Sequence, residues 1–495
     1  MRGIAHWIEK RASITPRRMA IITEEEQITY KELHEKITDA AAFLKQSFEV
    51  EKGDRVAILS QNRLEYLVLI FAIAKLEAIV VPLNIRLTAN ELRYQLNDSE
   101  TSVLVAEEPF IELAQSLLQE TGIKHLGRID AFTTIEDPLN HISIEINESA
   151  PFIICYTSGT TGKPKGAVLT QANMFWNAVN NILAIDLSSK DRSIVLLPLF
   201  HIGGIGLFAL PTLFAGGTVI IPGKFEPQKA IAMIERYEAT IVMGVPAIHK
   251  ALIECPSFNS ERMQSVRWFY NGGAPCPHEL IHLFFEQGFL FGQGFGMTET
   301  SPTLFMLSRE DARKKIGSIG KPVMFSDYKL VNEKGNVSRA EEVGELVVKG
   351  PNVMSGYWGR PEATSETMVD GWLYTGDLAR VDEDGFLYII GRKKEMIISG
   401  GENIYPLEIE QVIIQLEDVS EVAITGVTDP IWGEVPAAFV VKRPSSELTA
   451  QEIIEFCRDK LAKYKLPKDI IFIDELPKNA TGKIQKNKLV RPIHD

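Results

Sequence analysis

Cysteine is scarce in this chain of 495 residues, which has four, none of them in a C-x-x-C pair. A disulfide scaffold is therefore excluded, and a zinc site is disfavoured. The first 18 residues also lack an apolar core followed by a small-residue cleavage site, so no signal peptide is expected. We expect a cytoplasmic protein with four reduced, structural thiols: Cys155, Cys255, Cys276 and Cys457.

An excess of positive charge is also missing, because 52 Lys and Arg face 65 Asp and Glu, which gives a net charge of −13. An acidic chain lacks the electrostatic surface that nucleic acids require, so a nucleic-acid-binding role is disfavoured. Small phosphorylated ligands are not excluded, because they are held locally. The 45% hydrophobic and 24% charged fractions are those of an ordinary globular protein and exclude general disorder.

Long apolar segments are rare. One of them, residues 202–222, has no charged residue and is long enough to cross a bilayer. It contains five glycines and two prolines, however, so we predict a buried helix, a turn at Gly216-Gly217 and a buried strand. No transmembrane segment is expected. Peripheral membrane contact through apolar surface near a substrate entrance stays open, and we expect a monomer or a homodimer.

The sequence alternates helical and strand patterns. Its length suggests about three domain equivalents. A capping box at Thr29 and Glu32 opens one helix. Short β-branched runs between helices favour an α/β fold with layered, largely parallel sheets. The predicted strands are residues 55–59, 78–82, 102–106, 152–155, 194–197, 218–221 and 241–244.

The pattern changes twice in the second half of the chain. After about Gly317, short strands and turns indicate a small antiparallel β region. After Gly391, two helices and three strands, with a second capping box at Thr449 and Glu452, indicate a compact α+β unit. We therefore predict two domains: residues 1–391, with layered α/β subdomains plus the β region, and residues 392–495, a small α+β domain.

The most informative segment, residues 156–166, follows a strand-like run and combines glycines, hydroxyls and lysines. Glycines let main-chain N–H groups converge on an anion, and the hydroxyls and lysines add donors and charge. The segment therefore predicts a phosphate-binding loop. It is not the P-loop of kinases and GTPases, because Pro164 follows the lysine. The predicted phosphate-binding residues are Thr157, Ser158, Gly159, Thr160, Thr161, Gly162, Lys163 and Lys165.

Seven further motifs follow the loop: LFH at 199–201, NGGAP at 271–275, QGFGMTE at 293–299, YTGD at 374–377, GRKK at 391–394, SGGEN at 399–403 and PKNATGK at 477–483. With the loop and these motifs in order, nearly the whole chain resembles the adenylate-forming superfamily. That group includes acyl-CoA synthetases, aryl-CoA ligases, firefly-type luciferases and nonribosomal-peptide adenylation domains. The resemblance implies an enzyme that joins a carboxylate to the α-phosphate of ATP, releases pyrophosphate and passes the acyl group to a thiol, usually coenzyme A.

For the first domain, the resemblance implies that the loop holds the β- and γ-phosphates and that Thr298 contacts the α-phosphate. Glu299 would ligate Mg²⁺, a hard cation that suits a carboxylate. His201 would lie between the ATP site and the acyl pocket, where it orients the carboxylate or gates the pocket. Adenine would lie against Gly272, Gly273, Ala274, Pro275, Gly294, Phe295 and Gly296.

For the later part of the chain, the resemblance implies that Asp377, helped by Arg392, binds the ribose of ATP. Lys483 would be the catalytic lysine of the first half-reaction, acting when a mobile small domain closes over the large one. Lys394 would be the hinge about which that domain then rotates. The turn at Ser399, Gly400 and Gly401 would face the pantetheine arm of coenzyme A.

The acid is less well determined. The apolar, glycine-rich segment after His201 suits an alkyl tunnel, so we favour a medium- or long-chain fatty acid. An o-succinylbenzoate–CoA ligase of menaquinone synthesis is the alternative. No carrier domain follows Lys483, so free coenzyme A is the simplest acceptor. Two other readings are a stand-alone adenylation enzyme that loads a carrier protein and a non-catalytic nucleotide-binding regulator, although Glu299 and Lys483 argue against the regulator.

Overall fold

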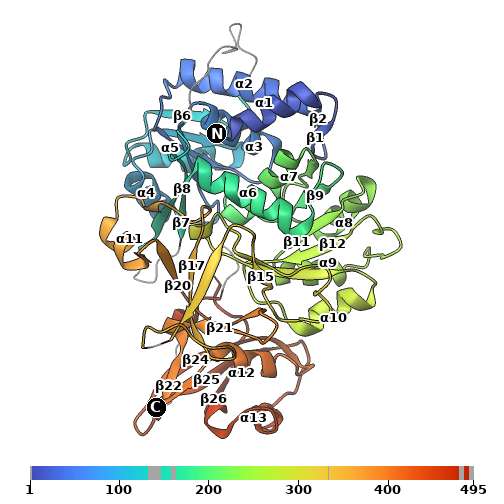
Figure 1. The fold of residues 1–495 in the computed structure, drawn as a ribbon, viewed down its shortest axis with the longest axis vertical. Helices are drawn as coiled ribbons and strands as arrows, with labels where there is room; N and C mark the ends of the chain where they lie inside the picture. Colours follow the sequence, from blue (N-terminus) through green and yellow to red (C-terminus); the bar gives the residue numbers. More distant parts are fainter. Residues whose placement is uncertain (1–2, 132–146, 158–162, 333, 479–483, 490–495) are drawn as a thin grey trace. The chain divides into compact units, whose positions relative to one another are not determined.

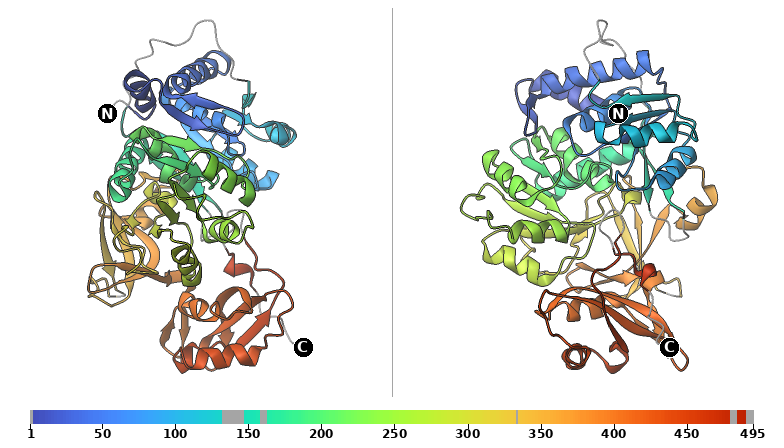
Figure 2. Two further views of the ribbon diagram at one scale, coloured as in Figure 1. Left: turned by 90° about the vertical axis from the view of Figure 1, so that its right-hand side faces the viewer. Right: turned by 180° about the vertical axis from the view of Figure 1, so that it is seen from behind.

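The computed structural model of the protein describes residues 3–131, 147–157, 163–332, 334–478 and 484–489 (Figure 1). Its contacts divide the chain into two compact units. The first comprises residues 1–276, 280–327 and 349–373, and the second comprises residues 277–279, 328–348 and 374–495. Figure 2 shows the elements of both units from two further sides.

The larger sheet of the first unit has nine strands in the order β15-β14-β13-β12-β11-β9-β10-β1-β2. The strands from β13 to β1 are parallel, whereas β14, β15 and β2 run antiparallel at the two edges. Their bounds are β1 Met19–Ile22, β2 Gln27–Thr29, β9 Arg192–Val195, β10 Thr218–Ile220, β11 Ile241–Gly244, β12 Trp268–Asn271, β13 Phe291–Phe295, β14 Phe305–Met306 and β15 Lys321–Pro322.

Side chains that alternate along these strands bury both faces of the sheet. Val242 and Phe269 pack in one apolar cluster with residues of α8, α9 and α10. Met243 and Tyr270 point the other way, into a cluster with residues of α6 and of the π-helix Gly204–Ala209. This covered, mainly parallel sheet is the α/β layer expected from the sequence. The helices are α6 Gln171–Ile185, α7 Leu210–Ala215, α8 Pro227–Arg236, α9 Pro246–Ile253 and α10 His278–Glu286.

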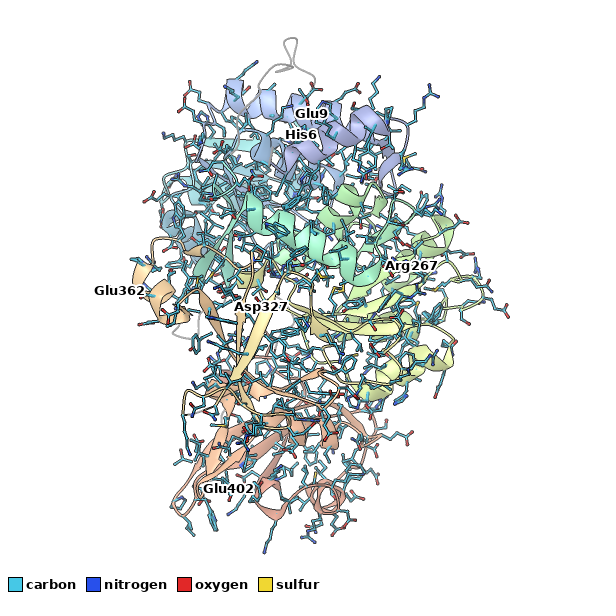
Figure 3. The ribbon with its side chains drawn as sticks, in the orientation of Figure 1. His6, Glu9, Arg267, Asp327, Glu362 and Glu402 are labelled. Atoms are coloured by element: carbon cyan, nitrogen blue, oxygen red, sulfur yellow. The ribbon has the colours of Figure 1, made fainter. Side chains whose placement is uncertain are left out.

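One ion pair links two segments near the amino ends of these strands. Arg267, labelled in Figure 3, lies just before β12, and its Nε is 2.7 Å from Oδ1 of the buried Asp191. Burial acts to raise the pKa of Asp191, but hydrogen bonds from Arg267 and from the Ser188 amide outweigh it and lower the pKa. The pair thus fixes the start of β12 against the start of β9.

The second sheet of this unit has seven strands in the order β18-β8-β7-β4-β3-β5-β6. Five are parallel, and β8 and β18 add an antiparallel edge. Its strands are β3 Arg55–Leu59, β4 Ile79–Pro82, β5 Val103–Ala106, β6 His125–Arg128, β7 Pro151–Thr157, β8 Lys165–Thr170 and β18 Gly356–Tyr357. The remaining helices are α1 Ala5–Ile14, α2 Tyr30–Ser47, α3 Leu64–Lys75, α4 Ala89–Asp98, α5 Ile111–Leu118 and α11 Pro361–Thr367.

The uncharged segment 202–222 forms the predicted helix, turn and strand. The π-helix continues into α7, Gly216 turns the chain with a φ of +84°, and β10 follows. Most of its apolar side chains are buried. Within the described part of the chain, no helix is long and apolar enough to cross a membrane.

The second unit contains two antiparallel sheets with one parallel addition. In the first, β17 lies between β16 and β20 and pairs with both, and β21 pairs with β20. In the second, the order is β23-β22-β25-β24, with β26 parallel to β25, and α12 and α13 cover one face. The bounds are β16 Asp327–Val331, β17 Gly344–Lys349, β20 Trp372–Val381, β21 Leu387–Arg392, β22 Ile397–Ser399, β23 Glu402–Ile404, α12 Pro406–Ile413, β24 Val419–Asp429, β25 Gly433–Lys442, α13 Ala450–Arg458 and β26 Asp469–Phe472. The short strand β19, Met368–Val369, falls in the residues of the first unit.

The α+β character of the C-terminal region is confirmed, and so are the capping boxes at Thr29 and Thr449. The contacts group residues 328–348 and 374–391 with the C-terminal residues. The domain boundary between residues 391 and 392 stays a prediction.

Candidate active site

The predicted phosphate loop is the connection of a β-hairpin. β7 and β8 pair antiparallel, with Thr157 opposite Lys165 and Tyr156 opposite Gly166. The hairpin register therefore fixes Thr157 and Lys165 at the two ends of the loop. Ser158, Gly159, Thr160, Thr161 and Gly162 lie outside the described residues.

Helix α4 holds both ends of this hairpin. The Tyr156 hydroxyl donates to Oδ2 of Asp98 over 2.9 Å, and the Tyr94 hydroxyl donates to the carbonyl of Pro164 over 3.1 Å. The Lys163 ammonium lies 5.8 Å from the centre of the Tyr94 ring, which is cation–π range. Asp98 also pairs with Arg360. These contacts were not predicted, because α4 lies about 60 residues before the loop in the sequence.

The second element of the site is the turn after β13, where Thr298–Thr300 forms one turn of 3₁₀ helix. Glu299 is 6% exposed, and its Oε1 accepts a hydrogen bond of 2.9 Å from the Tyr357 hydroxyl. The Lys165 ammonium lies 5.2 Å from the centre of the same tyrosine ring. The structure thus brings the predicted metal ligand to the hydroxyl, and a loop lysine to the ring, of one tyrosine.

Buried amides hold the backbone of this turn. Asn352, fully buried, donates to the carbonyls of Thr300 and Thr303 over 3.1 and 2.6 Å. From α6, the Asn177 side chain accepts a bond of 3.2 Å from the Thr303 amide. The Met354 amide donates to the Glu299 carbonyl over 2.8 Å. Since buried polar groups without partners are costly, these bonds specify one conformation of the turn.

Close packing adds to this constraint at Gly296. A Cβ there would lie 1.5 Å from the carbonyl oxygen of Pro302, so only glycine lets the strand fold back on itself. Gly294 is similarly enclosed, with the Phe305 carbonyl 2.6 Å from its Cβ position. The packing accounts for both glycines, and their predicted contact with ATP stays a prediction.

The predicted adenine segment starts where β12 ends. Asn271 and Gln293 are opposite one another in the parallel pairing of β12 and β13. The two segments therefore leave the sheet at the same carboxyl edge, which is where open α/β sheets bind ligands. The Asn271 amide donates to the Ala274 carbonyl over 2.9 Å and closes the turn, and Phe295 is half-buried beside Phe305.

His201 is largely buried, and its Nε2 has no hydrogen-bond partner within the described structure. Burial, with a smaller effect of Arg86, lowers its pKa to about 4, so the imidazole is neutral at pH 7. Asn62 holds the preceding loop, since its side chain bonds the Leu197 carbonyl at 2.8 Å and the Leu199 amide at 2.7 Å.

Cys155 lies on β7, two residues before Thr157, and is buried. Burial raises the pKa of Cys155 to about 12, although the Ile202 amide donates to its sulfur. All four cysteines are free thiols, as expected.

The predicted ribose-binding residues meet within the second unit. Asp377 and Arg392 are directly opposite one another in the β20–β21 pairing, and Arg392 Nε lies 2.8 Å from Asp377 Oδ1. Asp377 is 4% exposed. The register of the β20–β21 pair thus holds the Asp377 carboxylate beside the Arg392 guanidinium.

The other predicted residues of this unit lie on short irregular segments. Lys394 belongs to a turn of 3₁₀ helix, and burial, followed by repulsion from Arg392, lowers its pKa. Gly400 and Gly401 form the turn between β22 and β23, and the Gly400 amide donates to the Trp432 carbonyl over 2.8 Å. Lys483 lies outside the described residues.

Known protein families and a curated relative match nearly the whole chain. The AMP-binding enzyme family matches residues 8–358, and the AMP-binding enzyme C-terminal domain matches residues 408–483. A feruloyl-CoA synthase of Amycolatopsis sp is 40% identical over 490 residues, which cover 99% of each chain.

Two solved structures are similar along nearly the whole chain. The o-succinylbenzoate coenzyme A synthetase of Bacillus subtilis, in complex with ATP and magnesium ion, has a TM-score of 0.88 at 36% identity and 98% coverage of both chains. A fatty acyl CoA synthetase of Mycobacterium tuberculosis has a TM-score of 0.79 at 34% identity, with 98% of this chain and 97% of that chain covered.

Proposed function

The chain belongs to the AMP-binding enzyme family and is an acyl-CoA ligase of that family, and we propose that its acid is an aromatic carboxylate. In the proposed reaction, a carboxylate oxygen attacks the α-phosphorus of ATP and pyrophosphate leaves. The thiol of coenzyme A then attacks the acyl carbonyl, and AMP leaves. The enzyme itself stays free of covalent intermediates.

One observation carries the first half-reaction: the Lys165 ammonium and the buried carboxylate of Glu299 both contact Tyr357. The second lysine of the β7–β8 hairpin, Lys163, lies against Tyr94 of α4. Ammonium groups suit the β- and γ-phosphates, and preorganised cations stabilise charge that develops as pyrophosphate departs. A magnesium ion would neutralise phosphate charge. Lys163 and Lys165 would bind the phosphates, Thr298 would donate to the α-phosphate, and Lys483 would act at the reacting oxygens.

The residues present fit Mg²⁺ rather than a metal held by protein alone. Glu299 offers one hard carboxylate oxygen donor, and Mg²⁺ usually takes one or two carboxylates together with substrate phosphates and water. No group of three or more His, Cys, Asp or Glu side chains that could hold a metal occurs among the residues with described positions. A metal that arrives with ATP needs no such group.

The choice of acid rests on two observations. A Cβ at Gly204 would lie 2.1 Å from the Pro198 carbonyl, and one at Gly206 would lie 2.7 Å from the Ser301 carbonyl. Close packing of the backbone explains both glycines, so they are no evidence of space for an alkyl chain. The relatives named for feruloyl and o-succinylbenzoyl groups, at 36–40% identity, support an aromatic acid instead. A fatty acid is the second candidate, supported by the fatty acyl CoA synthetase structure.

His201 has a proposed role in holding that acid. A neutral imidazole whose buried Nε2 has no partner among the described residues is suited to hydrogen-bond a ligand. We place the substrate carboxylate or its neighbouring atoms there. The predicted hinge at Lys394, the ribose contacts of Asp377 and Arg392, and the coenzyme A turn at Ser399–Gly401 complete the proposal.

The test is pyrophosphate release with Mg-ATP across a panel of acids, each with and without coenzyme A. The panel comprises ferulate, 4-coumarate, o-succinylbenzoate, benzoate, and fatty acids from C6 to C16. Turnover that needs an aromatic acid and coenzyme A supports the proposal. A preference for a fatty acid would overturn the assignment of the acid but not of the reaction. Release without any benefit from coenzyme A would favour a carrier protein as the acceptor.

A further inference from the structure

Tyr357 makes two contacts that no other described side chain combines. Its hydroxyl donates to Oε1 of Glu299 over 2.9 Å, and its ring faces the Lys165 ammonium at 5.2 Å. Glu299 is the proposed magnesium ligand, and Lys165 is a proposed phosphate ligand. One neutral side chain therefore contacts both charged groups.

The position of Tyr357 is fixed by its own strand. β18 pairs with β8 so that Tyr357 lies opposite Ala167, two residues after Lys165. The Tyr357 amide bonds the Thr364 hydroxyl over 2.9 Å, and the next residue, Trp358, donates from its amide to the Gly166 carbonyl over 2.8 Å. The ring is thus held against the phosphate hairpin by backbone bonds on both sides.

The contact with Glu299 has a chemical consequence. The backbone of the turn is already fixed by Asn352 and Met354, so the direction of the carboxylate depends on its side-chain torsions. A hydroxyl that donates to one carboxylate oxygen selects one torsion and aims the carboxylate. Such outer contacts orient metal ligands, and their loss typically reduces metal affinity or activity by about 10–100-fold.

The contact with Lys165 acts on the phosphates. A lysine has a long, flexible side chain, and a cation–π contact restricts where its ammonium lies. The same ring that aims Glu299 therefore limits the position of the charge that meets the phosphates.

We infer that Tyr357 is a positioning residue that aims Glu299 at the metal and Lys165 at the phosphates of the same nucleotide. The inference rests on the proposed function. The inference assigns two effects to Tyr357, and each can be removed by a different substitution. The hydroxyl acts through the metal, and the ring acts through the phosphate-binding lysine.

The experiment compares Tyr357→Phe and Tyr357→Leu with a matched control, Tyr94→Phe. Tyr94 also faces a hairpin lysine, but its hydroxyl bonds the Pro164 carbonyl instead of Glu299. Mn²⁺ binding is measured by electron paramagnetic resonance in the presence of α,β-methylene-ATP, so the readout does not depend on turnover. The half-saturating Mg²⁺ concentration for pyrophosphate release and the thermal unfolding midpoint are measured alongside.

Tyr357→Phe should weaken Mn²⁺ binding about 10-fold and raise the Mg²⁺ requirement to match, with the KM for ATP at saturating Mg²⁺ little changed. Tyr357→Leu should show the same metal defect and also a higher KM for ATP. Tyr94→Phe should leave metal binding as in the wild type. Wild-type metal affinity in Tyr357→Phe, or an equal loss in Tyr94→Phe, would overturn the inference. Failure of the proposed function would appear in the wild type itself, as no nucleotide-dependent Mn²⁺ binding, and the inference would fall with it.

Discussion

The two units hold their predicted functional groups by different means. In the first unit, the turn at Thr298–Glu299 is fixed by buried neutral amides and by close backbone packing. In the second, Asp377 is fixed by strand register and an ion pair with Arg392, and Lys393 pairs with Glu345 at the surface. Buried neutral bonds resist salt and specify a single geometry, whereas exposed ion pairs contribute little and are easily exchanged. The difference is that the first unit fixes its turn with uncharged groups, whereas the second unit holds Asp377 beside a charged partner.

The largest expected effect is on the rate of the first half-reaction, and it tests the lysine that the C-terminal region contributes. Lys483→Ala should reduce the rate of pyrophosphate release by about 10²–10³, because it removes a cation aimed at developing phosphate charge. ATP binding, measured by calorimetry, should survive, since the first unit supplies the hairpin and the metal ligand. Lys488→Ala is the control from the same C-terminal segment. An unchanged rate in Lys483→Ala would remove the assigned role.

The next effect tests close packing in the first unit. Gly296→Ala should destabilise the protein by about 3 kcal/mol, because the new Cβ would overlap the Pro302 carbonyl. Urea unfolding measures the change. Gly122→Ala is the control, since its Cβ position has no atom within 4 Å and its φ is not positive. Equal stability of the two variants would show that the turn relaxes freely.

A smaller effect tests the ion pair in the second unit. Asp377→Asn should weaken ATP binding by about 10–150-fold, since hydrogen bonds to charged groups are worth about 1.5–3 kcal/mol. Glu341→Gln, which breaks an exposed pair with Arg380 in the same unit, should not change it. ATP affinity that is unchanged in Asp377→Asn would count against the ribose contact.

The smallest effect concerns proton binding by the first unit. The pKa of His201 is lowered to about 4 by burial, so the unfolded chain binds a proton more readily than the folded chain. Its contribution to stability is present above the unfolded pKa, about 6.5, and is lost progressively as the pH falls toward 4. When the pH falls from 7.5 to 5.5, the free energy of unfolding should therefore decrease by about 1 kcal/mol less in His201→Gln than in the wild type. Parallel pH profiles for the two proteins would contradict this account.

Local patterns predicted much of this structure. Residues 55–59 and 241–244 form strands with the predicted bounds, because β-branched runs between turn residues have few other solutions. The strand at residues 152–155 was predicted from its own residues, whereas the hairpin that it forms with β8 was not, and the phosphate-binding role of the loop stays a prediction. β20 was not predicted, because the segment Thr375-Gly376-Asp377 has the composition of a turn, yet tertiary pairing holds it inside a ten-residue strand.

The supports of the site were missed for a physical reason. Tyr357 and Asn352 contact a turn more than 50 residues away in the sequence, so no local pattern signals their role. One signal was available in α6, where Asn173, Asn177 and Asn181 recur every four residues and are all buried. Amides repeated on a buried face indicate that something polar must be bonded there.

The strand β18 has a consequence for how the molecule behaves in crowded solution. It is only two residues long and forms the outer edge of the seven-stranded sheet. A long, flat edge strand offers unpaired backbone groups to neighbouring chains and invites aggregation, and very short edge strands are one protection against it. Proline at the start of α11, four residues after Tyr357, then turns the chain away from the sheet. The strand that places Tyr357 is therefore also too short to offer a long row of unpaired backbone groups to another copy of the chain.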